Sequence, residues 1–322
     1  MPEIARVLIY GDIHLNSKNY GGHRDYANES LGYFRKITET AEEIQATHII
    51  GLGDFTFNRF HTLEYRSKVE DELEKQYKLT NGNRFEIKGN HDVAGYGMTE
   101  YEYYIEKGLI RPSENIQIGN VNISMIDNDK YNSTDIIKPD PDKSNIVLAH
   151  DYFKFSDTVI ADYGRAVELD SFERWFGVDY LICGHIHKQE AFSGRMFKGD
   201  ESHEMVVTYP GCMSRPAYRE GHMDTTGVML ELVISDDSPL KINVIRIPLL
   251  SIDECFNIKN INQKAEKKEE KRNRVDISDI VTSLNQHDGV VGNPEDIIMA
   301  MAGIDDKYKK KAIDLLKRGQ SE

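Results

Sequence analysis

The sequence has only three cysteines, and Cys183, Cys212 and Cys255 are far apart. An odd, scattered set excludes a disulfide framework and a Cys-x-x-Cys zinc site. Any bound metal must therefore be held by histidine, carboxylate or amide side chains. The chain also lacks a run of about 18 apolar residues that could cross a membrane. It lacks the basic start and cleavage site of a signal peptide as well, so we expect a cytoplasmic protein with no membrane partner.

Basic residues are in short supply, since 40 Lys and Arg stand against 54 Asp and Glu for a net charge of −14. Non-specific affinity for DNA comes mostly from Lys and Arg, so this balance argues against a stand-alone nucleic-acid binder. The deficit is uneven, because residues 259–322 carry 13 basic and 12 acidic residues, a net of +1, which leaves −15 for residues 1–258. Carboxylates that bind divalent cations do not repel phosphate as free ones do.

The first half of the chain predicts strands that alternate with helices. Apolar, β-branched runs predict strands at 4–10, 47–52 and 84–88, and helices are expected at 31–46 and 64–79. This alternation favours βαβ units and a mostly parallel sheet. The second half predicts a second sheet from strands at 121–127, 145–149, 178–183, 204–209, 227–234 and 241–247. The expected fold class is α/β, a two-sheet sandwich flanked by helices.

Polar motifs follow five of the predicted strands. They are Gly11-Asp12-Ile13-His14, Gly53-Asp54, Gly89-Asn90-His91-Asp92, His150-Asp151 and Gly184-His185-Ile186-His187. Ligands of parallel sheets bind beyond the carboxyl ends of the strands, so we expect these motifs to converge. Each has an ordinary alternative as a turn residue, a helix cap or a buried histidine. Five such motifs in one chain, each at a strand end, favour a single site.

Eight side chains of these motifs offer metal ligands: Asp12, His14, Asp54, Asn90, His91, His150, His185 and His187. Carboxylate, amide and imidazole donors together suit manganese, iron or zinc better than magnesium or calcium. The set exceeds the needs of one ion. Two ions roughly 3.5 to 4 Å apart that share Asp54 would make a site for phosphate-ester hydrolysis. We interpret His91 as the proton donor to the leaving oxygen, because its neighbour Asn90 can coordinate metal while the imidazole faces the substrate.

The motif set resembles the signature of the calcineurin-like metallophosphoesterases over most of residues 4–188. The resemblance implies two divalent ions, with Mn²⁺ favoured and Mg²⁺ as the alternative. It implies that one ion is bound by Asp12, His14, Asp54 and His187, and the other by Asp54, Asn90, His150 and His185. It also implies that His91 is the catalytic proton donor and that Asp92 orients His91.

Three stretches resemble the SbcD-type exonuclease subunits of that family. They are Asp12-Ile13-His14-Leu15 with Tyr20-Gly21, Arg24, Leu31 and Phe34; residues 178–189; and Tyr209-Pro210-Gly211-Cys212-Met213-Ser214-Arg215, for which a plain turn is the alternative. The resemblance implies a metal-dependent DNA exonuclease and endonuclease that acts with an SbcC-type coiled-coil ATPase in DNA end processing, repair, recombination or replication. It further implies a homodimer. The small cap region after residue 215 resembles compact bacteriophage forms, which places the protein in a bacterial or phage-infected cell.

The chain predicts three parts: a phosphoesterase domain at 1–258, a charged linker or solvated helix at 259–274, and a helical module at 275–322. The module predicts three short amphipathic helices, near the size below which domains seldom fold alone. It is interpreted either as a bundle packed on the main domain or as a docking module. The resemblance favours docking of the ATPase through residues 275–319.

Several features leave alternatives open. The family often carries an acid or histidine three positions after the second motif's aspartate, where this chain has Phe57; Asn58 or His61 are candidate substitutes. Lys188 and Arg215 are weak candidates for contacts with DNA phosphates. The acidic composition also suits a phosphodiesterase of the same fold that acts on nucleotides or other small molecules. A third hypothesis is an architectural site in a scaffold protein.

Overall fold

The computed structural model describes residues 4–17, 25–57, 61–93, 97–131, 137–158, 166–171, 173–214, 226–251 and 254, with 298–299, 309–310 and 313 near the C-terminus. The chain divides into two units, residues 1–257 and 258–322. The predicted linker at 259–274 lies outside the described residues, as do Asn58, Arg215 and nearly all of the helical module predicted at 275–322. No helix of the described ranges has the length and apolar content needed to cross a membrane.

The described strands of the first unit form two larger sheets. The first sheet has the order β13 (Ser238–Pro248), β12 (Thr226–Ser235), β1 (Ala5–Tyr10), β2 (His48–Gly51) and β3 (Arg84–Glu86). The second has the order β10 (Glu190–Lys198), β11 (Glu201–Tyr209), β9 (Tyr180–Gly184), β6 (Ser144–His150), β5 (Val121–Ile126) and β4 (Asn115–Ile118). A short pair, β7 (Phe153–Lys154) and β8 (Val167–Glu168), is separate.

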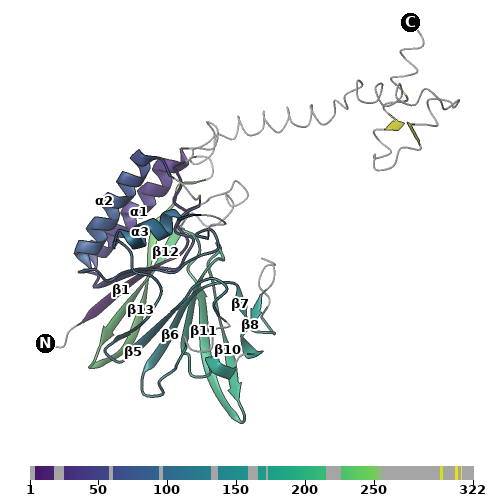
Figure 1. Cartoon of the computed structure of the whole chain (residues 1–322). Coiled ribbons are helices and arrows are strands. Elements are labelled where there is room, and N and C mark those ends of the chain that lie inside the picture. The colour runs from purple at the N-terminus through teal and green to yellow at the C-terminus, as the bar shows by residue number, and fades with distance from the viewer. Residues whose placement is uncertain are drawn as a thin grey trace, which may run out of the picture. The chain divides into compact units, whose positions relative to one another are not determined.

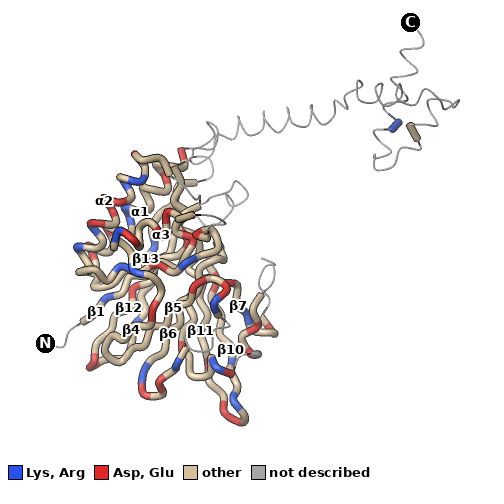
Figure 2. Tube along the Cα trace, viewed as in Figure 1, with Lys and Arg blue, Asp and Glu red and all other residues tan. Residues whose placement is uncertain are grey.

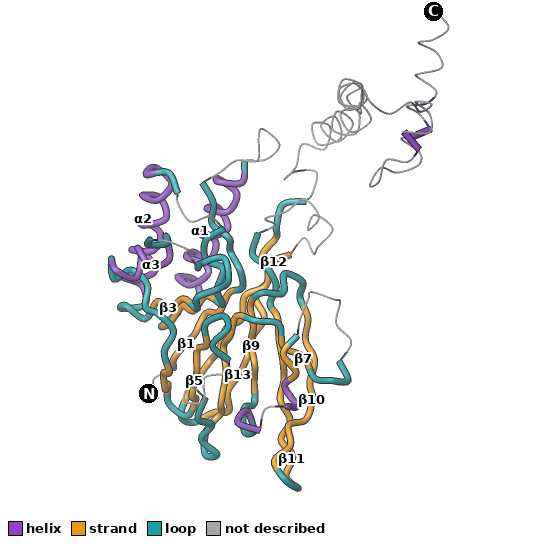
Figure 3. Tube along the Cα trace, turned by 45° about the vertical axis from the view of Figure 1, so that its right-hand side comes forward, coloured by secondary structure: helices purple, strands orange, loops and turns teal. Residues whose placement is uncertain are grey.

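Helices α1 (Tyr26–Glu43), α2 (Leu63–Leu79) and α3 (Glu100–Glu106) lie together on one side of the first sheet (Figures 1 and 3). The alternation along β1 explains how the layers form, because successive strand residues point to opposite faces. Leu8 and Tyr10 pack in the core that includes the helices, whereas Val7 and Ile9 pack in the core that includes strands of both sheets. The far face of the second sheet is covered by β7, β8 and the 3₁₀ turns η1 (Leu169–Ser171) and η2 (Glu173–Trp175).

The structure confirms the predicted α/β class with two sheets flanked by helices, and corrects the strand assignment. Strands β12 and β13 were expected in the second sheet, but β12 pairs antiparallel with β1 in the first, with Ala5 opposite Ile234. Both sheets are therefore mixed rather than mostly parallel. Strand β10 and helix α3 were not predicted. Helix α1 begins at Tyr26 rather than at residue 31, because its N-cap is Asp25, whose side chain accepts the Asn28 N–H.

Candidate metal centre

Two pairs of parallel strands, one pair in each sheet, bring their carboxyl ends to one place. Strand β1 runs parallel to β2 in the first sheet, and β6 runs parallel to β9 in the second. Asp12 and His14 follow β1, Asp54 follows β2, and His185 follows β9, while His150 ends β6. The loops approach so closely that a Cβ on Gly184 would lie 2.4 Å from the Leu52 carbonyl oxygen and 2.6 Å from Asp12 Oδ1. Glycine at this position permits the contact between the two sheets.

The first predicted group of ligands is assembled. Asp12, His14, Asp54 and His187 each place a ligand atom within 4.8 Å of the others. The Nε2 atoms of His14 and His187 are 3.0 Å apart, and His187 Nε2 lies 3.4 Å from Asp12 Oδ2. His14 Nε2 lies 3.8 Å from Asp54 Oδ2. Asp12, His14 and Asp54 are almost fully buried, so their donor atoms converge in a dry site.

The second predicted group converges on the other oxygen of Asp54. His150 Nε2 lies 3.4 Å from Asp54 Oδ1. The amide oxygen of Asn90 lies 3.0 Å from His150 Nε2 and 3.0 Å from His185 Nδ1. Asp54 thus presents Oδ2 to one group of ligands and Oδ1 to the other, which is the arrangement expected of a residue that bridges two ions.

The hydrogen bonds around His150 fit a divalent cation. Its Nδ1 lies 2.8 Å from the Leu52 carbonyl oxygen, to which it must donate a proton. A neutral His150 then has a lone pair on Nε2, directed at the Asn90 and Asp54 oxygens, which are themselves acceptors. Acceptors 3.0 to 3.4 Å apart repel one another unless a cation or a proton lies among them. The donor set, two carboxylates, an amide and four imidazoles, suits transition-metal ions.

Without a bound ion, a proton on His150 meets this requirement. Burial disfavours protonation of His150, but the carboxylates of Asp54 and Asp12 outweigh it and raise the pKa of His150 to about 10. The same interactions hold the pKa of Asp54 far below its ordinary value despite the cost of burial. Burial lowers the pKa of His14 to about 4. At neutral pH, His14 is therefore uncharged and able to act as a ligand.

The backbone is strained where these ligands sit. Six described non-glycine residues have positive φ, and three of them are His14 at 50°, Asp54 at 49° and His185 at 78°. Each such conformation costs on the order of 1 to 3 kcal/mol unless the surrounding structure enforces it. Here the backbone N–H of His14 donates to the Asp54 carbonyl at 2.9 Å, which holds two of the strained residues together.

His91 lies beside both groups of ligands and is exposed. Its backbone N–H donates to Asp54 Oδ1 at 2.8 Å. Its imidazole ring stacks on Phe57 and meets the edge of His14 with ring centroids 5.1 Å apart. The exposed imidazole of His91 therefore lies next to the point on which the ligand atoms converge.

Asp92 is fully buried and acts on the backbone around the site. Its carboxylate accepts the backbone N–H groups of Phe55, Thr56 and Gly89 at 3.1, 2.9 and 3.0 Å. Its neighbour His91 donates its own N–H to Asp54, so Asp92 supports His91 by fixing the two loops that carry them. Burial and the nearby Asp54 charge raise the pKa of Asp92 to about 7.

The weaker candidates have other contacts. Lys188 is exposed, and its Nζ lies 2.6 Å from Glu190 Oε1. The side chain that was predicted to contact a DNA phosphate therefore forms an ion pair with Glu190. His61 is buried, and its Nε2 donates to the Leu15 carbonyl at 3.0 Å, a structural contact for this candidate substitute. The sequence analysis did not predict that two residues lie at the site: Cys212, beside His187, and Phe57, whose ring lies beside His91. The sequence did contain a signal for each, because Cys212 follows Pro210-Gly211 and Phe57 lies shortly after Gly53-Asp54.

Comparison with known proteins gives one family match. The family model described as calcineurin-like phosphoesterase matches residues 5–189, more than half of the chain. No curated protein matches the chain. Among solved structures, the crystal structure of a dimetal phosphatase from Danio rerio is similar with a TM-score of 0.42 and 9% sequence identity, over 78% of this chain and 100% of that one.

Proposed function

Because this chain belongs to the calcineurin-like phosphoesterase family, we propose that it is a metal-dependent DNA exonuclease and endonuclease of the SbcD type. Its role would be DNA end processing for repair, recombination or replication, as the nuclease subunit of a complex with an SbcC-type ATPase. The family and the buried Asp–His cluster give the coarser statement, a metal-dependent phosphoesterase. DNA as the substrate and the ATPase as the partner belong to the proposal.

The proposed chemistry divides between the ions and the chain. The two groups of ligands would hold two divalent ions, which we propose to be Mn²⁺; the ions would supply a nucleophile at neutral pH and stabilise charge on the phosphoryl oxygens. Asp54 holds both groups of ligands in register through its two oxygens. His91 gives a proton to the leaving oxygen as the phosphodiester bond breaks. Asp92 keeps the loops of Asp54 and His91 fixed by binding their backbone N–H groups.

One observation concerns the segment that resembles the SbcD-type subunits. The Tyr209–Ser214 segment, which resembles that subfamily, is hydrogen-bonded to the loops that carry Asp12 and His187. The Met213 N–H donates to the Asp12 carbonyl at 2.7 Å, and the Cys212 N–H donates to the His187 carbonyl at 3.0 Å. Ser214 Oγ donates to the Ile13 carbonyl at 2.8 Å. A plain turn would not need these contacts, so the segment is part of the site's framework.

Charge bears on the substrate. Along the described trace, Figure 2 shows Lys and Arg interspersed with Asp and Glu. The net −15 of residues 1–258 predicts weak binding of duplex DNA by this chain alone. In the proposed complex, the ATPase supplies much of the DNA-binding surface. We also propose that the nuclease is a homodimer, a state that light scattering of the purified chain measures directly.

The same charge favours a second candidate, a phosphodiesterase for nucleotides or other small molecules. Such an enzyme has no need of an extended cationic surface. The candidates differ in what residues 275–319 do, because a small-molecule enzyme has no reason to bind a coiled-coil ATPase through them. A third candidate, a scaffold whose site is architectural, predicts that the complex processes DNA normally after Asp54→Asn.

The test is co-purification of the full chain with an SbcC-like ATPase from the same genome, followed by a DNA degradation assay. The proposal predicts a stable complex that degrades linear duplex DNA faster than either protein alone. The double variant Ile280→Asp, Leu284→Asp places charge on an apolar face of the predicted module and should release the ATPase. The Asp279→Asn variant of the neighbouring position is the control and should retain it. Absence of a complex, together with hydrolysis of small diesters, would favour the second candidate.

A further inference from the structure

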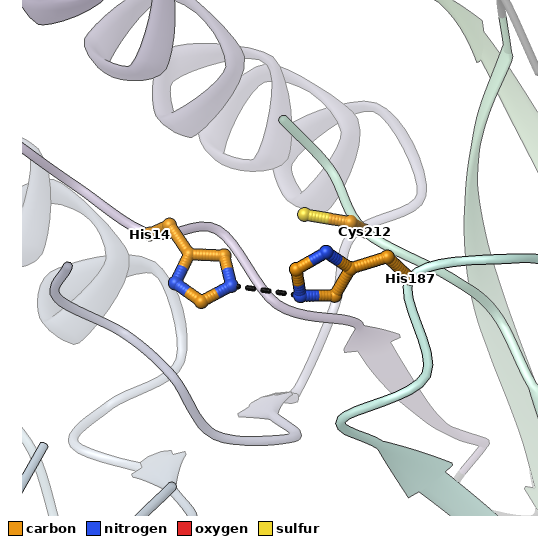
Figure 4. Close-up of side chains that lie close together, drawn as sticks. All are labelled: His14, His187 and Cys212. Atoms are coloured by element: carbon orange, nitrogen blue, oxygen red, sulfur yellow. Dashed lines mark hydrogen bonds between the residues drawn. The ribbon is translucent and has the colours of Figure 1, made fainter. Parts of the chain in front are cut away.

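Cys212 lies next to the metal centre although it belongs to none of the predicted ligands. One ligand atom each from His14, His187 and Cys212 lie within 4.8 Å of one another. Figure 4 shows the Cys212 thiol beside the imidazole of His187, on the side that faces His14. Two of the three side chains are buried, and Cys212 is only 7% exposed. Two imidazoles and a thiol are a donor set that zinc and cadmium bind.

The thiol is held in place by the loops of the metal centre. The Cys212 backbone N–H donates to the His187 carbonyl at 3.0 Å, and Sγ lies 3.1 Å from the Asp12 carbonyl oxygen. That carbonyl also accepts the Met213 N–H at 2.7 Å. Loss of the thiol proton would therefore leave the Asp12 carbonyl satisfied. A buried carbonyl oxygen without a hydrogen-bond partner is costly. Because the Asp12 carbonyl keeps the hydrogen bond from the Met213 N–H, loss of the S–H hydrogen bond from Cys212 costs little.

We propose that Cys212 is a ligand for thiophilic divalent ions, Zn²⁺ or Cd²⁺, which it binds together with His14 and His187. The inference rests on the proposed metal-dependent function, since it uses two ligands of that site. When the ion binds, the S–H bond of Cys212 breaks, its proton passes to solvent, and a metal–sulfur bond forms. The imidazoles contribute neutral nitrogen donors, and the thiolate offsets one of the two charges of the ion.

The thiol would make the centre selective between metals. The group that contains Cys212 and the group that contains Asp12 and Asp54 share His14 and His187. An ion bound through the thiol and an ion at Asp12 and Asp54 would therefore draw on the same two histidine side chains. Hard ions such as Mn²⁺ and Mg²⁺ favour the carboxylates, whereas Zn²⁺ and Cd²⁺ gain from the sulfur. A thiophilic ion would therefore compete with the ion expected at Asp12 and Asp54.

Cobalt(II) tests this assignment, because a cobalt–thiolate bond gives a near-ultraviolet charge-transfer absorption that nitrogen and oxygen ligands do not. The full chain is titrated with Co²⁺ as wild type, as Cys212→Ser and as Cys183→Ala. Cys183 is the matched control, a fully buried thiol whose pKa is raised far above its ordinary value by burial. We expect the absorption in wild type and in Cys183→Ala, and its loss in Cys212→Ser. The affinity for Zn²⁺, measured against a chelating dye, should fall at least about tenfold in Cys212→Ser.

An absorption that survives Cys212→Ser, or that is absent from wild type, overturns the inference. If Cys212→Ser does not fold, alkylation of the wild type decides: one equivalent of Zn²⁺ should protect Cys212 in peptide mapping, and an unprotected Cys212 contradicts the inference. Hydrolysis of bis-p-nitrophenyl phosphate by the wild type with Mn²⁺ tests the proposed function separately. Hydrolysis without the cobalt–thiolate band would contradict only the role of Cys212 as a ligand. The band without hydrolysis would contradict only the proposed function.

Discussion

Phe57 lies face to face with His91, with ring centroids 5.1 Å apart and ring planes 18° apart. Both rings meet His14 edge-on, at 5.6 Å for Phe57 and 5.1 Å for His91. Phe57 stands where the family resemblance led us to expect an acid or a histidine. Its apolar face therefore supplies an orienting contact for the exposed imidazole of His91.

Replacement of Phe57 by alanine should slow catalysis more than it weakens substrate binding. Aromatic pairs contribute about 0.5 to 1.5 kcal/mol beyond the area they bury, so loss of the stack predicts a fall in kcat of about 2- to 10-fold with little change in KM. Steady-state hydrolysis of bis-p-nitrophenyl phosphate measures both constants. Phe57→Tyr keeps the ring and should restore kcat. A rise in KM at constant kcat would show that Phe57 contacts substrate rather than positioning His91.

Asp54→Asn should lower the affinity for both ions, because Asp54 Oδ1 and Oδ2 face different groups of ligands. Isothermal titration with Mn²⁺ should show two sites in the wild type and a loss on the order of 10- to 100-fold in affinity at both in the variant. Asp142→Asn, at an exposed turn, is the control with unchanged binding. Loss of one site with the other intact would refute the bridging role of Asp54.

A buried ion pair beneath the site should be important for stability. Arg84 and Glu86 are fully buried, with Arg84 Nη2 2.6 Å from Glu86 Oε2, and the Tyr10 hydroxyl donates to the same oxygen at 2.6 Å. Arg84→Met leaves the Glu86 carboxylate without its cation, so the free energy of unfolding in urea should fall by about 3 to 5 kcal/mol.

The matched control is an exposed pair, Lys68 and Glu64, whose atoms are also 2.6 Å apart. Because water screens exposed charges, Lys68→Met should leave the urea midpoint nearly unchanged. Equal losses of stability in Arg84→Met and Lys68→Met would contradict the assignment of a special role to the buried pair.

His48 should make the fold sensitive to mild acid. Burial, followed by repulsion from Arg111, lowers the pKa of His48 to about 4, whereas an unfolded histidine titrates near about 6.5. The unfolded chain therefore binds this proton first, so stability is full above about pH 6.5 and falls as the pH drops toward 4. Thermal unfolding between about pH 7.5 and pH 5 should show a smaller decline in Tm for His48→Gln than for the wild type. Parallel curves would exclude His48 as a source of acid sensitivity.

The sequence predicted those features that are local or that follow from the ends of parallel strands. Asp12, Asp54 and His185 could be placed together because each follows a short apolar strand and parallel strands end at one edge. Strands β12 and β13 were assigned to the wrong sheet, because an apolar strand sequence does not show which strand it pairs with. The pairing of Ala5 with Ile234, which are far apart in the sequence, places β12 in the first sheet.

Contacts between distant residues were equally hidden. Cys212 lies at the site because its backbone N–H donates to the His187 carbonyl and its thiol contacts the carbonyl of Asp12, which is 200 positions away in the sequence. No local pattern encodes that distance. Lys188 shows the opposite case, because its basic character suggested a phosphate contact, whereas Glu190, two residues on, pairs with it. Sequence spacing indicates which residues can reach a site, and packing decides which ones do.

The measurement that tests the account most directly is cleavage of linear duplex DNA and bis-p-nitrophenyl phosphate, side by side, by wild type and His91→Asn with Mn²⁺ or Mg²⁺. We predict Mn²⁺-dependent hydrolysis of both substrates, DNA degradation that increases with the ATPase partner, and a loss of about 100-fold or more in His91→Asn. His91→Asn should still bind Mn²⁺, which separates proton donation from metal loss. Full activity of His91→Asn, or intact DNA in the presence of the partner while the small diester is hydrolysed, would contradict it.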